Sequence, residues 1–438
     1  MMKYMKTKEA SLEAAVGVTE KWDAREAGRE VARSTIEKLS SPPDFFLLFS
    51  TIHYKDHGGF QELLEGVYDI LPPETPLIGG TVAGFINNYG VYVHGVTALA
   101  VSYPYMDVAI GIGKNTKRNP KKAVKQSYEM IKKEFEKSIY KNKFVFNFVS
   151  GASVMKIPGQ GYKKVIDSGF MSKFVMLAFG MSQYLLQKGL GREDEIFEEL
   201  TKKFPDSYML LGASIDDHKG INNYQFYNNK IFTNSVVNLG ISTDLDLDVC
   251  TTHGMKESNI KFNITKLSKN KHIIHKINNK PAVSELYKIL NWPEGFLNDK
   301  TMTHTIIYYP ISLHRHGREV PVVMPFILKD SIMVPCVIDS GGVSIMTVSG
   351  ANLVQALEEN LQSFYSIQPE FGLCSICMTI LDTLGYQTNI IRDKTLNYFK
   401  NKPFIMFFCA GEGTYSPIKK MTYANMSFNI SVFGNKKQ

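Results

Sequence analysis

One short pattern recurs three times in this chain and limits the folds that it can form. In its first copy, Pro76–Gly84 (PLIGGTVAG), an apolar pair leads into two glycines, and a second apolar segment, Val96–Val101, follows a polar turn. The other two copies are Leu210–Ser214 followed by Asn234–Leu239, and Phe404–Gly411 followed by Asn425–Val432. Each copy predicts a buried strand that ends where the backbone needs freedom or close approach. Three copies indicate duplication of one module.

Another apolar strand precedes each copy, at Phe45–Phe49, Phe144–Val149 and Phe371–Met378. From this strand to the glycine pattern is 32 residues in the first module and 33 in the third, whereas the second carries an insertion, predicted at residues 150–203. Helical patterns fill these intervals. We therefore expect an α/β (α+β layered) fold of duplicated strand–helix–strand–strand modules, with largely antiparallel or mixed sheets and helices on the outside.

The remaining helices and strands are predicted from the spacing of apolar residues and from the residues that begin and end such elements. Helices are expected at Ala24–Leu39, Phe60–Leu71, Ala123–Phe135, Glu193–Lys203, Pro281–Leu290 and Ala351–Leu361. Further strands are expected at Met106–Gly113, Leu245–Thr252, Thr305–Pro310 and Val320–Leu328. The alternating, Lys-rich and Asn-rich segment Phe262–Ile277 predicts a hairpin on the surface.

The amino-acid composition indicates which kinds of partner and which cellular compartment to expect for this chain. The 438 residues carry a net charge of +8, but the basic residues are spread out and the aromatic residues lie in apolar strands, so no nucleic-acid partner is expected. The most apolar segment, Phe170–Leu186, is short and contains Lys173 and Ser182, which predicts a partly buried or partner-facing helix rather than a membrane span. With five cysteines and no secretory signal pattern, a cytoplasmic location is expected.

Several motifs, taken in order, resemble the FIST sensory family in both its N-terminal and C-terminal halves. They are AVGVTEKWDAREAGREVA, PDFFLLFST, PLIGGTVAG, LLGASIDD, THG, KPAVSELY, EFGLC and CAGEG, and they run from about Ala15 to Phe433. The resemblance implies an N-terminal tail at 1–14, a FIST N-like domain at 15–230 and a FIST C-like domain at 231–438. It also implies an intracellular sensory module that binds small ligands such as amino acids. Some members look like F-box proteins, and some bind haem and sense nitric oxide.

The chain departs from the family pattern in three places. Phe85 stands where an acidic residue often follows the first glycine motif, and Cys377 replaces the Arg expected three residues after Cys374. In addition, no output domain is fused, so a stand-alone sensor that signals in trans is expected. The two substitutions remove a carboxylate and a guanidinium that could orient a zwitterion.

The ends of the repeated strands supply most of the candidate ligand-binding residues. Gly79, Gly80 and Thr81 could offer backbone N–H groups and a hydroxyl to a ligand carboxylate, or could simply form a strand that bends. At the equivalent end of the second module, Ser214, Asp216 and Asp217 could accept hydrogen bonds from a ligand ammonium. Asp in such turns also caps its own backbone.

The C-terminal half adds four candidates, each with a structural alternative. His253, at a strand end, could bind a ligand or a metal, or be a satisfied structural histidine. Glu412 matches the family's glycine–glutamate position, and Asn425 could bind ligand or brace a turn. Cys374 and Cys377 form a CxxC, but residues three apart on a strand face opposite ways, so buried thiols are expected and no metal site is predicted.

These observations predict a sensory and signal-transduction protein that binds a small, amino-acid-like metabolite and signals to a protein partner. It is not expected to be an enzyme or to carry a resident cofactor. Two alternatives are a non-covalent haem-binding sensor of nitric oxide, with His253 as the haem ligand, and a thiol-dependent enzyme that uses Cys374 with His253 as base.

Overall fold

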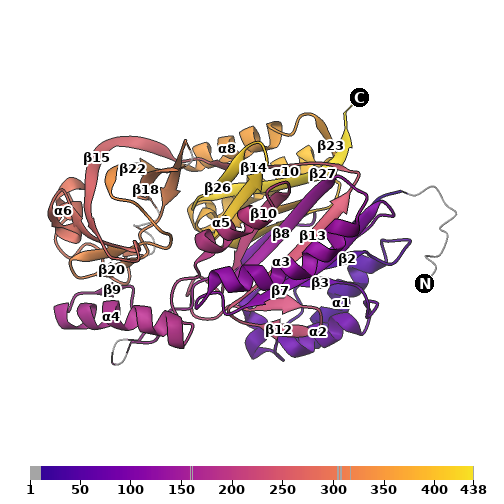
Figure 1. The fold of residues 1–438 in the computed structure, drawn as a ribbon, viewed down its shortest axis with the longest axis horizontal. Coiled ribbons are helices and arrows are strands. Elements are labelled where there is room, and N and C mark those ends of the chain that lie inside the picture. Colours follow the sequence, from indigo (N-terminus) through magenta and orange to yellow (C-terminus); the bar gives the residue numbers. More distant parts are fainter. Residues whose placement is uncertain are drawn as a thin grey trace.

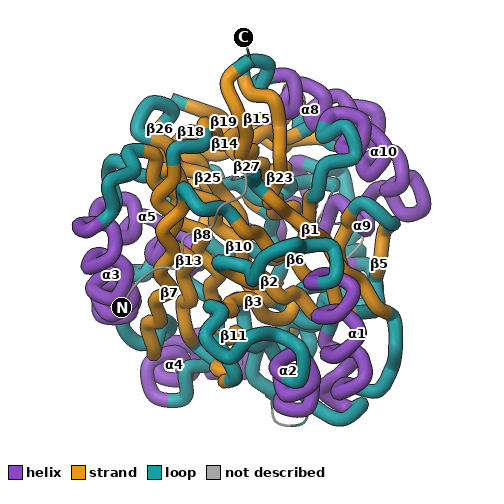
Figure 2. The backbone as a smooth tube through the Cα atoms, turned by 90° about the vertical axis from the view of Figure 1, so that its right-hand side faces the viewer, coloured by secondary structure: helices purple, strands orange, loops and turns teal. Residues whose placement is uncertain are grey.

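The computed structural model describes residues 11–157, 159, 161–302, 305, 308–315 and 317–437. These residues form four β-sheets with helices around them (Figures 1 and 2), which confirms the predicted layered class of mixed sheets and outer helices. The predicted N-terminal tail lies largely outside the described residues. No helix in the described part of the chain is long and apolar enough to cross a membrane.

The first sheet contains residues Leu77–Thr81 of the first copy of the glycine pattern. Its strand order is β1 (Glu13–Thr19), β6 (Val96–Ser102), β2 (Phe45–Ser50), β3 (Leu77–Thr81), β11 (Gln225–Tyr227) and β12 (Lys230–Phe232). Strands β2 and β3 are parallel, and every residue in β2, β3 and β6 is buried, as expected for apolar strands covered on both faces. Helices α1 (Ala24–Ile36) and α2 (Phe60–Tyr68) lie on its outer side, with the 3₁₀ turn η1 (Ile52–Asp56).

The second sheet repeats this plan around another parallel pair, β8 with β10. Its order is β26 (Lys420–Tyr423), β25 (Glu412–Ser416), β10 (Tyr208–Ser214), β8 (Asn142–Ser150), β13 (Ser235–Thr243) and β7 (Met106–Lys114). Helices α3 (Pro120–Lys137) and α5 (Glu193–Lys203) cover it.

The third sheet is built around the parallel pair β23 and β24. Its order is β14 (Asp246–His253), β27 (Ser427–Lys436), β23 (Ile367–Cys377), β24 (Phe404–Cys409), β4 (Gly84–Asn87) and β5 (Val91–Tyr92). Its helices are α8 (Gly350–Gln362), α9 (Met378–Leu384) and α10 (Thr388–Tyr398), with the 3₁₀ turn η2 (Gly385–Gln387).

The three sheets exchange hairpins in a ring. Hairpin β4–β5 follows β3 in the chain but pairs with β24 of the third sheet. Hairpin β11–β12 follows β10 but pairs with β3 of the first sheet, and β25–β26 follows β24 but pairs with β10 of the second. Each sheet is thus completed by a neighbour's hairpin. The three units share this order of elements, and duplication as its origin stays a prediction.

Aromatic side chains from all three parallel pairs fill the space between the sheets. Phe49 of β2 stacks on Phe407 of β24 with ring centroids 4.4 Å apart, and it lies edge-on to Phe148 of β8 at 5.6 Å. All three are fully buried. The centre of the molecule is therefore an apolar core.

The fourth sheet forms a separate body, at the left of Figure 1. Its order is β19 (Arg318–Val322), β18 (Ile311–Arg315), β22 (Gly341–Thr347), β15 (Lys256–Leu267), β16 (Ile273–Ile277), β21 (Ser331–Met333), β20 (Phe326–Leu328) and β9 (Val165–Ile166), with β17 (Lys280–Pro281) beside β16. Helices α4 (Gly169–Leu185) and α6 (Ala282–Ile289) lie against it. Strand β9 and α4 come from the predicted insertion.

Two sequence predictions for this body need correction. The hairpin expected at 262–277 forms as β15 and β16, but Phe262, Ile264 and Ile274 are buried in a core, because only alternate residues of β15 face solvent. The strand expected at 305–310 begins instead at Ile311, and the described residue Thr305 is helical. The predicted domain boundary near residue 230 stays a prediction; β13, which follows it, pairs with β7 and β8, which precede it.

Candidate functional site

The three parallel strand pairs end at one place in the molecule. Their last paired residues are Ser50 with Thr81, Ser150 with Ser214, and Cys377 with Cys409. Backbone hydrogen bonds link these ends in a ring: Ile215 N–H donates to the Thr81 carbonyl (3.0 Å), Ala410 N–H to Ala213 (3.5 Å) and Ala83 N–H to Phe408 (3.0 Å). The predicted strand ends of all three modules are thus neighbours.

In the first module the glycines permit close backbone contact. Gly79 and Gly80 have φ values of 155° and 152°, and a Cβ on Gly79 would lie 1.8 Å from the Leu48 carbonyl oxygen. The Thr81 N–H donates to the Tyr224 carbonyl, and the Thr81 hydroxyl accepts from the Tyr224 N–H, both at 3.0 Å. These three predicted residues therefore join β3 to the exchanged segment before β11.

In the second module the predicted residues have different surroundings. Ser214 is buried, donates to the Val149 carbonyl (3.0 Å) and accepts from Gln225 Nε2 (2.6 Å). The buried Asp216 carboxylate accepts four backbone N–H groups of its own loop, from residues 219 to 222, at 2.6–3.0 Å. Asp217 is exposed. The structure does not bring Asp217 to the strand ends.

His253 and Asn425 contact the fourth sheet. His253 Nε2 lies 2.9 Å from the Glu319 carbonyl oxygen, and burial lowers the pKa of this imidazole. The Asn425 N–H donates to the Pro321 carbonyl, and its side-chain oxygen accepts from the Val323 N–H. Both residues hold the end of β19 against the third sheet.

Cys374 lies within β23, fully buried, and burial raises the pKa of its thiol well above the ordinary range. The register opposes Cys374 to Ile430 of β27, whereas His253 is opposed to Ser427, one strand further across and three residues along. The cysteine and histidine of the thiol-enzyme alternative are therefore not brought together.

Cys377, the second cysteine of the CxxC motif, lies near the buried Glu412. Cys377 lies opposite Cys409, and Cys409 Sγ is 3.9 Å from Glu412 Oε2. Burial raises the pKa of the Glu412 carboxyl well above its ordinary value. Among the described residues, Glu412 Oε1 has no hydrogen-bond partner. A buried polar oxygen without a hydrogen-bond partner is costly.

Glu193, which the sequence analysis did not single out, is adjacent to this cluster. It is the first residue of α5 and is buried. A Cβ on Gly411, next to Glu412, would lie 3.0 Å from Glu193 Cγ. Burial raises the pKa of the Glu193 carboxyl to about 8. An acidic residue in a first helical turn is an ordinary helix signal, so nothing local marked it as buried.

Lys117 is the second residue that sequence reasoning missed. Its Nζ donates to Ser153 Oγ (2.6 Å) and to Asn234 Oδ1 (2.8 Å), and the side chain is buried. Burial lowers the pKa of this amine to about 7, and the charge of Glu193 opposes the change. Lys117 stands in the polar, lysine-rich segment 114–122, and nothing in that segment marks this lysine as buried.

Comparison with known proteins places the chain in a family. The model of the FIST N domain matches residues 44–280, which is more than half of the chain. The chain belongs to the FIST family. No curated protein matches it. A crystal structure of cyanuric acid hydrolase from A. caulinodans aligns over 98% of this chain and 100% of that one, with a TM-score of 0.35 and 7% sequence identity. A similarity at this level supports no inference about the fold or the function of this protein.

A FIST domain indicates a role in sensing and signal transduction. Phe85 and Cys377, at which the sequence analysis expected departures from the family pattern, lie in buried positions. Phe85 stacks on Tyr92, with ring centroids 5.1 Å apart, and pairs with Phe407, so it is part of the core. Cys377 accompanies Glu412 at the strand ends.

The cluster in this FIST protein combines two protonatable carboxyls, Glu193 and Glu412, with the amine of Lys117. The carboxyls can accept hydrogen bonds from an ammonium, and the amine can donate to a carboxylate. The Tyr423 hydroxyl is also buried without a partner among the described residues. No group of three metal-ligating side chains suited to an ion occurs in the part of the chain that the structure describes.

Proposed function

We propose that this FIST protein is an intracellular sensor that binds a small, amino-acid-like metabolite at Glu193, Glu412 and Lys117. The observation that supports this most is the orphaned Oε1 of the fully buried Glu412. A ligand ammonium would supply the missing donor. Lys117, protonated on ligand binding, would then hold the ligand carboxylate.

Helix α5 offers a route from this ligand site to a partner. Its first residue is Glu193, and the next, Asp194, accepts a hydrogen bond from the Val337 N–H of the fourth sheet's body at 2.8 Å. Because the cluster is buried, ligand entry would displace α5 or the turn at Gly411. Such a displacement would alter the contact between the two bodies, and a partner protein would detect it.

The proposal is tested by thermal unfolding of the purified protein against a panel of zwitterionic metabolites. A ligand that binds only the native state raises the melting temperature by mass action. Glu412→Gln and Lys117→Met should abolish the shift produced by an active metabolite, whereas Glu198→Gln, on the exposed side of α5, should keep it. A folded protein that responds to no member of the panel would contradict the proposal.

The haem sensor and the thiol enzyme stay predictions that no observation here favours. His253 Nε2 is already engaged by the Glu319 carbonyl, and Cys374 is remote from His253 in the register. We propose that the protein binds its ligand without chemical turnover. Absence of a Soret band after haem reconstitution, and an unchanged metabolite after incubation, are the expected results.

A further inference from the structure

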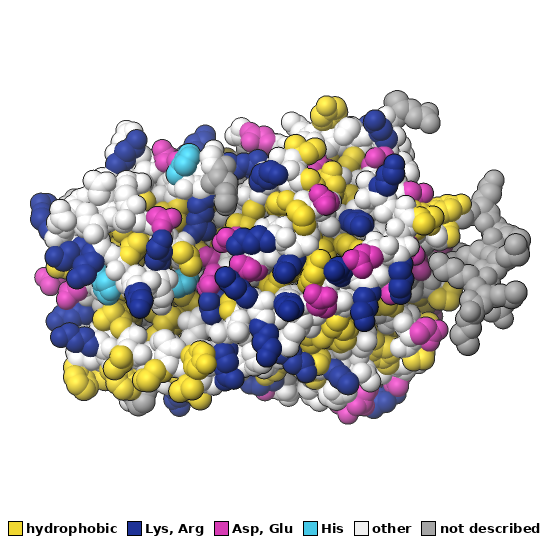
Figure 3. Space-filling model, in the orientation of Figure 1, with side chains coloured by type: hydrophobic (Ala, Val, Ile, Leu, Met, Phe, Trp, Pro, Cys, Tyr) yellow, Lys and Arg dark blue, Asp and Glu magenta, His cyan; other side chains and the backbone are white. Residues whose placement is uncertain are grey.

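Helix α4 presents a continuous apolar stripe to solvent. The side chains that form it recur at helical spacing: Phe170, Phe174, Leu177, Met181, Tyr184 and Leu185. Phe170 is 79% exposed and Leu177 is 71% exposed. At 3.6 residues per turn all six fall within an arc of about 100°. Figure 3 shows hydrophobic side chains gathered at the lower left of the molecule, where Figure 1 places α4.

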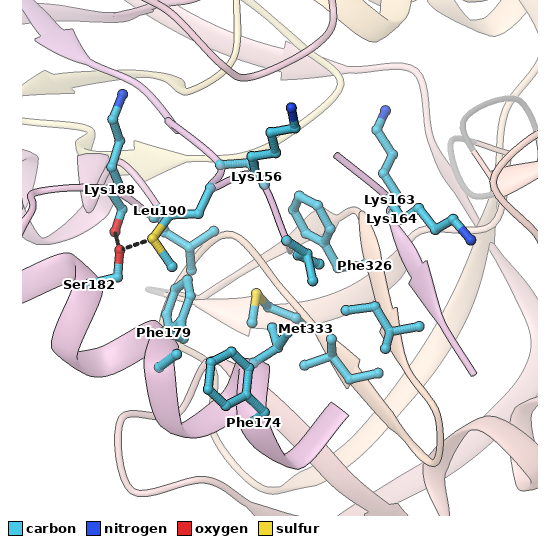
Figure 4. A pocket seen from close by; sticks show the side chains of 18 residues that line it. Lys156, Lys163, Lys164, Phe174, Phe179, Ser182, Lys188, Leu190, Phe326 and Met333 are labelled. Carbon is cyan, nitrogen blue, oxygen red and sulfur yellow. Dashed lines mark hydrogen bonds between the residues drawn. The ribbon is translucent and has the colours of Figure 1, made fainter. Parts of the chain in front are cut away.

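The opposite face of α4 is also apolar and holds the helix in place. Val175 and Phe179 of α4, with Phe326 and Met333 of the fourth sheet, line a cavity of about 80 Å³ between the helix and the sheet (Figure 4). None of the predicted ligand-binding residues lines this cavity. Because the inner face is already packed, the helix cannot bury the outer stripe by turning about its axis. The stripe needs a partner outside this body.

Basic groups lie at both ends of the stripe. At the C-terminal end, Arg118 donates to the Tyr184 and Leu185 carbonyls, at 2.7 and 2.9 Å, and its guanidinium lies 5.7 Å from the centre of the Tyr184 ring. At the other end, Lys329 Nζ lies 3.1 Å from where a Cβ on Gly169 would be. Lys173, on α4 itself, is also exposed and by helical spacing lies at the margin of the stripe. The stripe therefore has basic groups at both ends and along one side.

We propose that α4 docks this protein onto an anionic lipid surface. The exposed stripe would lie in the interface, parallel to the membrane, and Arg118, Lys173 and Lys329 would contact the headgroups. An apolar helix face with basic neighbours is the usual composition of an interfacial helix. The stripe lies on a single convex helix, so it can enter a soft interface without a matching groove. Packing α4 of a second copy on it would instead bring like charges together.

The test is flotation of the full chain with vesicles of phosphatidylcholine, with and without phosphatidylglycerol. We expect binding to the anionic vesicles that weakens with added salt, and little binding to the zwitterionic ones. Leu177→Glu should reduce binding at least about tenfold. The matched control is Tyr365→Glu, at a 76% exposed aromatic residue between α8 and β23, and it should bind like the wild type.

Two results would overturn the proposal. The first is wild-type protein that floats with neither vesicle, or Leu177→Glu protein that floats as well as wild type. The second is sedimentation of the wild type as a dimer that Leu177→Glu dissociates, because the occupant of the stripe would then be a second copy. If Leu177→Glu fails to fold by circular dichroism, Phe170→Gln at the most exposed position of the stripe repeats the test.

Discussion

At the scale of single residues, Glu193 and Lys117 make the stability of this protein depend on pH near neutrality. Unfolding returns the pKa of Glu193 from about 8 to its ordinary value of 4.5, so raising the pH between these values favours the unfolded chain. Lys117 acts in the opposite sense, because its pKa rises from about 7 to 10.5 on unfolding, and raising the pH above 7 favours the folded chain. These two contributions alone give a stability minimum between pH 7 and 8, and the buried Glu412 carboxyl, whose pKa is also raised, adds a fall in the same direction as Glu193.

Glu193→Gln should remove the contribution of Glu193 to the falling part of this dependence. Relative to the variant, the wild type should lose on the order of 3 kcal/mol of unfolding free energy as the pH rises from about 5 to about 8. Urea unfolding at several pH values measures this difference. Glu198→Gln removes an exposed carboxyl from the same helix and should follow the wild type within about 0.5 kcal/mol. Parallel curves for wild type and Glu193→Gln would show that Glu193 is ionised in the folded protein.

The backbone at Gly79 allows a second prediction at this scale. Gly79→Ala should destabilise the protein by about 3 kcal/mol or more, because its Cβ would lie 1.8 Å from the Leu48 carbonyl oxygen in a neighbouring strand. The control is Gly180→Ala within α4, where nothing lies within 4 Å of the added carbon, and a gain of about 0.5–1 kcal/mol is expected. Chemical denaturation of both variants distinguishes the two sites, and a tolerated Gly79→Ala would mean that β2 and β3 can separate.

At the scale of elements, the loop after β10 depends on one carboxylate. Asp216→Ala leaves the four N–H groups of residues 219–222 without their acceptor, at an expected cost of about 2–4 kcal/mol. Asp217→Ala changes the exposed neighbour and should cost less than about 0.5 kcal/mol. Equal losses of unfolding free energy in the two variants would contradict this assignment.

At the scale of the whole molecule, the exchanged hairpins couple units that are distant in sequence. Phe226 of β11 is fully buried beside Phe60 of the first unit, with ring centroids 5.5 Å apart. Phe226→Ala should cost about 3–5 kcal/mol and should speed hydrogen exchange in β2 and β3, well over a hundred residues earlier in the chain. Tyr365→Ala, at an exposed site, should leave these amides unchanged. Faster exchange confined to residues near 226 would show that the hairpin opens alone.

The extent to which sequence predicts this structure differs between local and distant features. Apolar runs and glycines placed β2, β3, β8, β10 and β24, because the signals for a buried strand are local. The hairpin exchange carries no local signal, since β11 has the same composition whether it pairs with β10 or β3. Glu412 was found through its glycine neighbours. Lys117 was missed because its burial depends on Ser153 and Asn234, which are distant in sequence.

The ring of hairpins has a consequence for synthesis on the ribosome. The first sheet lacks β11 until residue 227 has emerged, and the edge of β4 that does not face β5 stays unpaired until β24, which ends at residue 409, is available. A nascent chain therefore exposes the edge of β3 while residues 82–227 are made, and one edge of β4 for most of its translation. Open strand edges promote aggregation. We therefore expect the yield of this protein in cells to rise with the supply of chaperones that bind exposed strand edges during synthesis.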